Sequence, residues 1–325
     1  MKSISIGNNI PFANNHLIGT VEILLAFSLA GSSIVVAKLL SLRVPVFTTG
    51  VLSLIVAFIC MLPVQWTKRR EIKRLNRREI GLMLLQALCG IVLFRIFTLY
   101  GLRYTSAADA SIITAATPAV MALLSVLLLK ERLRFNVMLG VLAALGALVM
   151  INLGSLKPGE LSGSFFGNLL IFCAVVSEVL LTIFRRFTKA GISSITNTTL
   201  LSLFSILMMF PVALVELQTF DLLQMTIQDW LAILYYGAVA TAAAYILWGD
   251  GALRIPAAYT GVACVSMPIT ALLLSSFVLG ETLTSMHLVG CVLAVTGILC
   301  CNLNFISPGK MGSIKAGKFQ RNETI

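Results

Sequence analysis

The chain consists of long apolar stretches separated by short polar segments. Each stretch has about 20 residues, the length that an α-helix needs to cross roughly 30 Å of hydrocarbon. Spanning β-strands would alternate apolar and polar residues, whereas these runs are continuous. The pattern predicts an all-α membrane protein with ten transmembrane helices. They cover residues 17–40, 44–66, 80–99, 107–129, 134–153, 164–186, 193–216, 228–249, 257–279 and 285–305.

Composition supports the same class of protein. Of the 325 residues, 58% are hydrophobic and 11% are charged, whereas a soluble domain carries about 25% charged residues. The seven cysteines lie in apolar stretches, and the only histidines are His16 and His287. Their spacing matches no metal motif, so we expect neither a metal nor another cofactor.

The net charge of +11 is explained by orientation in a membrane. Basic residues gather in the links after 66, 129, 186 and 254 and in the tail, and Lys and Arg favour the cytoplasmic side. We therefore expect a cell inner (plasma) membrane protein with both termini cytoplasmic, comprising segment 1–16 and a basic tail at 306–325. Nucleic acid is not expected as a partner, because no aromatic-studded basic surface lies between the spans.

At an offset of 150 residues, the fourth and fifth spans align with the ninth and tenth, which indicates an internal repeat. The repeats are expected at 17–153 and 164–305, joined by an external linker at 154–163. Because each holds five spans, an odd number, the second must enter the membrane with inverted orientation. Inverted repeats are typical of secondary transporters, whose substrates bind near the midplane. Identical pairs include Ala107/Ala257, Pro118/Pro268, Glu131/Glu281, Gly140/Gly290 and Asn152/Asn302.

These paired positions form a recognisable motif. The first repeat contains LRYTSAA at 102–108, Pro118, LLKE ending at Glu131, and Gly140; the second contains ALRIPAA at 252–258, Pro268, LGE ending at Glu281, and Gly290. With GSSIVVAK at 31–38, this set resembles the EamA repeat of the drug/metabolite transporter superfamily. The resemblance implies a ten-helix carrier, usually an exporter of metabolites, amino acids or related compounds. Arg95 departs from the family pattern, which has an uncharged residue there.

Five ionisable residues inside the spans are candidates for the substrate or proton pathway: Glu22, Lys38, Arg95, Asp109 and Glu178. Each deserves a functional hypothesis, because a charge in the bilayer costs at least about 2.5 kcal/mol. Arg95 can grip a substrate carboxylate or phosphate, or pair internally with Glu178 or Asp109. Glu178 can hold a coupling proton, receive a cationic group or pair with Lys38 or Arg95.

The other three candidates have simpler alternatives. Glu22 and Lys38 lie near the ends of the first span, where a side chain can reach the membrane interface. Asp109 lies near the start of the fourth span and can stabilise a helix N-terminus.

Three further groups have structural or supporting roles. Glu131 and Glu281 precede the fifth and tenth spans and are expected to cap helix ends. Pro118 and Pro268 each remove a backbone hydrogen bond, which permits a kink or hinge. Three aromatic residues can line a cavity or belong to the interfacial aromatic belt: Tyr245, Trp248 and Tyr259.

The sequence and the resemblance together therefore predict a secondary transporter that exports a small metabolite, amino-acid-like or otherwise polar or amphipathic, by alternating access driven by protons or by exchange. The chain has no Walker-type glycine loop for ATP. An intramembrane enzyme and a non-catalytic scaffold or receptor are the alternatives, but the chain shows neither a catalytic motif pair nor a sensory domain. A homodimer is compatible with the sequence.

Overall fold

The computed structural model describes residues 12–72, 75–129, 135–154, 161–188, 192–255 and 257–302, all helical or connecting segments. The first half contains α1 (Phe12–Arg43), α2 (Val46–Thr67), α3 (Arg69–Ile72), α4 (Arg77–Ala87), η1 (Leu88–Leu93), α5 (Phe94–Tyr104), α6 (Ala107–Thr114), α7 (Thr117–Leu129) and α8 (Phe135–Gly154). The second contains α9 (Leu161–Arg186), α10 (Ser194–Glu216), η2 (Leu222–Gln224), α11 (Ile227–Leu234), η3 (Tyr235–Ala243), α12 (Ala244–Arg254), α13 (Ala257–Ala263), α14 (Ser266–Leu279) and α15 (Ser285–Asn302).

Six continuous helical segments are long and apolar enough to cross a membrane: His16–Arg43, Val46–Thr67, Arg77–Tyr104, Ser164–Arg185, Ser194–Glu216 and Ile227–Ala252. The bent pair α6–α7 makes a seventh, and shorter apolar helices lie at Val137–Ala147, Ser266–Leu279 and Ser285–Cys300. The expected class, an all-helical multi-pass membrane protein, is confirmed.

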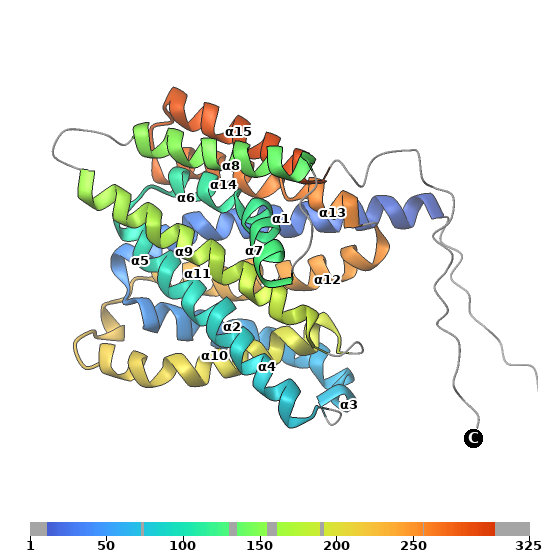
Figure 1. Cartoon of the computed structure of the whole chain (residues 1–325). Helices are drawn as coiled ribbons and strands as arrows, with labels where there is room; N and C mark the ends of the chain where they lie inside the picture. Colours follow the sequence, from blue (N-terminus) through green and yellow to red (C-terminus); the bar gives the residue numbers. More distant parts are fainter. Residues whose placement is uncertain are drawn as a thin grey trace, which may run out of the picture.

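Contacts between the two halves come in matched pairs. α1 packs along α12, and in the same way α9 packs along α5. α1 also crosses α14, and α9 correspondingly crosses α6 and α7. α2 pairs with α10, and α8 pairs with α15. In Figure 1 these last two pairs form opposite edges of the bundle, with α1, α5, α9 and α12 between them. The core is thus shared by the two halves rather than divided between them.

Two sets of contacts define the ends of the bundle. At one end the Glu281 carboxylate reaches the start of α6, and Glu216 reaches the start of α2. At the opposite end Glu22 pairs with Arg254, and Glu71 accepts hydrogen bonds from Ser193. We call these the Glu281 end and the Glu71 end.

Helices α2 and α10 are capped by carboxylates from each other's half. Glu216, at the end of α10, accepts from the backbone N–H of Thr48 at 2.7 Å, and Glu71, just beyond α2, accepts from that of Ser193 at 2.9 Å. Burial alone would raise the pKa of Glu71, but hydrogen bonds from Thr196 and Ser193 and the charge of Lys68 outweigh it, so the pKa lies below its usual value. Both helix starts therefore hold a stabilised anion.

Equivalent irregularities interrupt the helices of both halves. The segments η1 and η3 are π-helical and directly precede α5 and α12, and such segments often mark functional sites. α6 and α7 meet at 41°, and a corresponding break at Cys264 separates α13 from α14. Pro118 and Pro268 lie just after these breaks, in a first helical turn that does not need their missing N–H.

Glycines allow the closest helix crossings. A Cβ atom on Gly31 of α1 would lie 2.3 Å from the carbonyl oxygen of Met267 at the start of α14. Gly101 and Gly167 bring α5 and α9 together, and Gly19 and Gly251 do the same for α1 and α12. These contacts hold the central helices closer than any side chain would permit.

We predict that Gly31→Ala lowers the melting temperature of the purified protein, because overpacking costs about 1–3 kcal/mol. Gly81→Ala is the matched control, since a Cβ at this position in α4 meets nothing within 4 Å and alanine favours a helix by up to about 1 kcal/mol. Melting followed by fluorescence-detected size-exclusion chromatography measures both. Equal melting temperatures for the two variants would contradict this packing.

Candidate functional site

Arg95 is the second residue of α5, the helix that directly follows the π-helical η1. Its side chain is buried, with only 5% of the residue exposed. The guanidinium group donates to Ser53 Oγ of α2 at 2.8 Å and to Thr241 Oγ1 of η3 at 3.2 Å. It also lies over the ring of Tyr236, 4.5 Å from the centroid. The cation on α5 is therefore contacted by α2 of the first half and by η3 of the second.

In the part of the chain that the structure describes, the positive charge of Arg95 has no acidic partner. Among the described residues, no carboxylate lies within ion-pair distance, so the expected pairing with Glu178 or Asp109 is not seen. Ser53 and Thr241 are neutral hydroxyls that already donate to backbone carbonyl groups. A buried and uncompensated guanidinium group is costly unless an anion joins it.

Glu178 is a second ionisable residue that forms no ion pair among the described residues. Its Oε2 atom accepts a long hydrogen bond of 3.4 Å from Thr117, at the α6–α7 break. Tyr245 lies within electrostatic range of both Glu178 and Arg95, and Cys264, at the α13–α14 break, lies within range of Glu178. The centre thus holds an arginine and a glutamate that do not pair, with a tyrosine near both.

Tyr245 occupies the position in α12 that Arg95 occupies in α5, 150 residues earlier. It keeps 38% of its surface exposed. Trp248, on the same helix, is 39% exposed, so its role in a cavity wall stays a prediction. Tyr259 lies apart, at the Glu71 end, where its ring packs edge-on against His16. The three aromatic candidates therefore do not form one wall.

Lys38 and Glu22 are held by protein groups at opposite ends of the bundle. Lys38 Nζ donates to the carbonyl oxygens of Leu102 at 2.5 Å and Thr105 at 2.7 Å, closing the C-terminal end of α5. Glu22 forms an ion pair with Arg254 that ties α1 to α12. Both arrangements favour the structural alternative for these residues.

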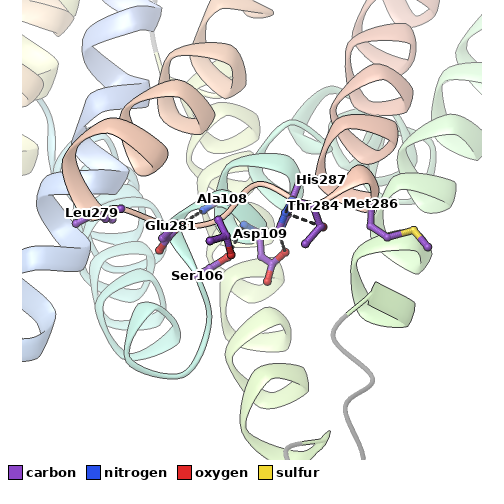
Figure 2. A pocket seen from close by; sticks show the side chains of 10 residues that line it. Ser106, Ala108, Asp109, Leu279, Glu281, Thr284, Met286 and His287 are labelled. Carbon is purple, nitrogen blue, oxygen red and sulfur yellow. Dashed lines mark hydrogen bonds and ion pairs between the residues drawn. The ribbon is translucent and has the colours of Figure 1, made fainter.

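Asp109 and Glu281 lie together in a pocket at the Glu281 end, with a volume of about 470 Å³ (Figure 2). Asp109, in the first turn of α6, forms a 3.1 Å contact with Nε2 of His287 in α15. The Nδ1 atom of that ring accepts from the backbone N–H of Thr284 at 2.9 Å, which places the imidazole proton on Nε2.

Glu281 caps a helix of the other half. Its carboxylate oxygens accept from the N–H groups of Ala107 and Ala108, both at 2.9 Å. The sequence predicted that Glu281 caps the start of the tenth span. The helix that it caps is instead α6, which belongs to the expected fourth span. Glu131, its counterpart, lies outside the described residues.

Sequence reasoning missed the polar partners of Arg95. Ser53, Tyr236 and Thr241 are ordinary residues in apolar stretches, and nothing in their local pattern distinguishes them. The closest available signal is Gly237, whose Cβ would lie 2.4 Å from the carbonyl oxygen of Ser53. Its small size permits α2 and η3 to approach here.

Comparison with known proteins agrees with this architecture. Residues 17–153 and 165–303 each match the EamA-like transporter family. The chain is 33% identical over 279 residues to the uncharacterized transporter YetK of Bacillus subtilis, covering 86% of this chain and 84% of that protein. It is 26% identical to the uncharacterized transporter YyaM of the same organism, over 70% of this chain and 74% of that one.

A solved crystal structure shares the fold. It is 20% identical in sequence and superposes with a TM-score of 0.63, covering 92% of this chain and 99% of its own. The protein described here belongs to the EamA-like transporter family. Its activity is therefore that of a transporter and not of an enzyme, as the sequence predicted.

We predict that Glu281→Gln lowers the melting temperature by weakening the interaction between a charge and the start of α6, which is typically worth about 0.3–2 kcal/mol. Thr282→Ala, at an exposed neighbouring position, is the control and should melt like the wild type. Fluorescence-detected melting tests both variants. The capping role is wrong if the two behave alike.

Proposed function

We propose that this transporter exports a small polar or amphipathic metabolite with an amino-acid-like charge pattern. The observation that carries the proposal is the buried Arg95, which has no acidic partner among the described residues. A substrate carboxylate would supply the missing charge in a geometry that matches the guanidinium fork. Glu178, also unpaired, would receive a cationic group of the same molecule. Tyr245, within range of both, would contact its middle.

The proposed mechanism is alternating access between two inverted five-helix repeats. Ten spans arise if α8, α13–α14 and α15 cross the membrane together with the seven longer segments. The matched helix contacts of the two halves and the paired breaks beside Pro118 and Pro268 support this symmetry. Rocking of one repeat against the other would expose Arg95 and Glu178 to each side in turn.

In the proposed orientation the protein lies in the cell inner (plasma) membrane, with the Glu71 end and both termini facing the cytoplasm. Exposed basic residues at the Glu71 end include Arg69, Arg70, Arg77 and Arg78, which agrees with the preference of Arg for the cytoplasmic side. Acidic groups such as Glu216, Asp221 and Asp229 lie in or beside one link at the other end.

Coupling to a proton gradient is assigned to Glu178. A carboxylate that binds either a proton or a cationic substrate group can link the two fluxes, since one occupant displaces the other. Exchange of one substrate for another would use the same two charges without a net proton.

The direct test is transport by protein reconstituted in proteoliposomes, with a panel of radiolabelled zwitterionic, anionic and cationic metabolites. We expect zwitterions to be carried, and Arg95→Gln to reduce their flux by at least about tenfold through the lost charged hydrogen bonds. Arg78→Gln, exposed at the Glu71 end, is the control. Transport restricted to cations, or unchanged by Arg95→Gln, would refute the proposed substrate class.

Glu178→Gln separates coupling from binding. We expect accumulation driven by a pH gradient to be abolished, because glutamine cannot release a proton, while the variant still inserts in the membrane. Flux is measured with and without the imposed gradient. Gradient-driven accumulation at the wild-type rate would remove Glu178 from the mechanism.

Topology is tested by cysteine labelling with a membrane-impermeant maleimide in intact cells. In a background without the native cysteines, Thr282→Cys should react from outside, whereas Arg78→Cys should react only after permeabilisation. Labelling of both sites from the same side would contradict the inverted arrangement.

A further inference from the structure

A second pocket lies at the Glu281 end, away from the pocket of Figure 2. Its volume is about 490 Å³, and it is bounded by the α1–α2 corner, the end of α5 and the link that follows α10. Polar and charged groups contribute one part of the lining and apolar side chains the other. They include Ser41, Arg43, Arg103 and Glu216, together with Leu42 and Phe220.

Arg103 is held in place at this pocket by groups that leave its charge uncompensated. Its Nε atom donates to the carbonyl oxygen of Ser41 at 2.8 Å, and its guanidinium group lies 5.2 Å from the centroid of the Tyr100 ring. Among the described residues no carboxylate pairs with it. The two terminal nitrogens therefore remain available as donors in a fixed plane.

Arg43 adds a second cation with only a weak partner. Its side chain is 52% exposed, and its Nη1 atom lies 3.5 Å from Oδ1 of Asp229. The other oxygen of Asp229 is occupied by Thr226, whose backbone N–H and hydroxyl group donate at 2.9 and 2.7 Å. The aspartate is thus the third residue of α11 and completes a capping box with the N-cap Thr226.

Glu216, the carboxylate that lines the pocket, is also occupied. One oxygen accepts from the N–H of Phe47 at 3.2 Å, and the other accepts from the N–H and hydroxyl group of Thr48 at 2.7 and 2.9 Å. Its negative charge is therefore stabilised by the positive start of α2. The pocket thus holds two guanidinium groups, and both Glu216 in its lining and Asp229 beside Arg43 accept hydrogen bonds from other donors.

We propose that this pocket binds an amphiphilic anion, a phosphate or carboxylate group carried on an apolar body. Two guanidinium groups suit the oxygens of such a head, and Leu42 and Phe220 would contact the apolar part. The anion comes either from a phospholipid of the surrounding leaflet or from a soluble compound at this end of the transporter. This site is distinct from the central one: Arg103 lies about 12 Å along α5 from Arg95 at 1.5 Å per residue.

Titration calorimetry of the whole protein in a neutral maltoside detergent tests the site with hexyl phosphate, with hexanol as the uncharged control probe. We expect hexyl phosphate to bind and hexanol not to bind. Arg43→Gln and Arg103→Gln should each weaken binding by about tenfold, as expected for a charged hydrogen bond. Arg78→Gln at the opposite end should leave the affinity unchanged.

Native mass spectrometry with phosphatidylglycerol and phosphatidylcholine identifies the source of the anion. Selective retention of phosphatidylglycerol that is lost in Arg43→Gln supports a lipid head group, whereas binding of hexyl phosphate without such retention supports a soluble anion. Arg43→Gln is the decisive variant, since Arg43 makes one long contact and its loss should not impair folding. Absence of binding by both probes, or binding that neither arginine substitution weakens, would overturn the proposal.

The central site provides an independent check. Arg95→Gln should leave hexyl phosphate affinity unchanged even where it stops transport. Loss of hexyl phosphate binding in Arg95→Gln would place the probe at the centre and overturn this assignment, whereas failure of transport with intact binding would count only against the proposed function.

Discussion

A charged side chain inside a bilayer has lost its hydrating water, so it is stable only where protein groups replace that water. This constraint explains the surroundings of Lys38 and Glu281. Lys38 donates to the carbonyl groups that end α5, and Glu281 accepts from the amides that begin α6. Each charge is thus solvated by the end of another helix. Against that background, the central Arg95 is an exception, because among the described residues it has hydroxyl and aromatic partners but no acidic one, and the proposed substrate site rests on this difference.

The same capping contacts also join the two halves of the chain. Glu216, at the end of α10, caps the start of α2, and Glu71, just beyond the end of α2, caps the start of α10. The two caps lie at opposite ends of this helix pair. Glu281 reaches from the second half to α6 in the first. If each helix end were capped by a residue of its own half, these contacts would not link the two halves. In the proposed alternating-access motion, movement of one half against the other would alter the electrostatic environment of these helix ends, so the capping contacts at the two ends would respond to it.

Much of the architecture could be predicted from the sequence, because apolar length and charge distribution are local properties. The helices lie at the expected apolar stretches, and Arg95 stood out as a charge inside one of them. Its surroundings could not be predicted, since Ser53 and Thr241 are separated from it by 42 and 146 residues. The cap formed by Glu281 illustrates the same difficulty: a motif located the glutamate, but only the packing of α14 against α6 reveals which helix it serves.

The equivalence of Arg95 and Tyr245 has a consequence for energetics. In a duplicated fold whose halves were chemically identical, the conformation open to one side and the conformation open to the other would have equal energy. Here one copy carries a cation and the other a phenol at the same place beside a π-helical segment. Under the proposed alternating access, exchanging the two environments would move the charge between unlike surroundings, so the unloaded molecule would have a built-in preference for facing one compartment.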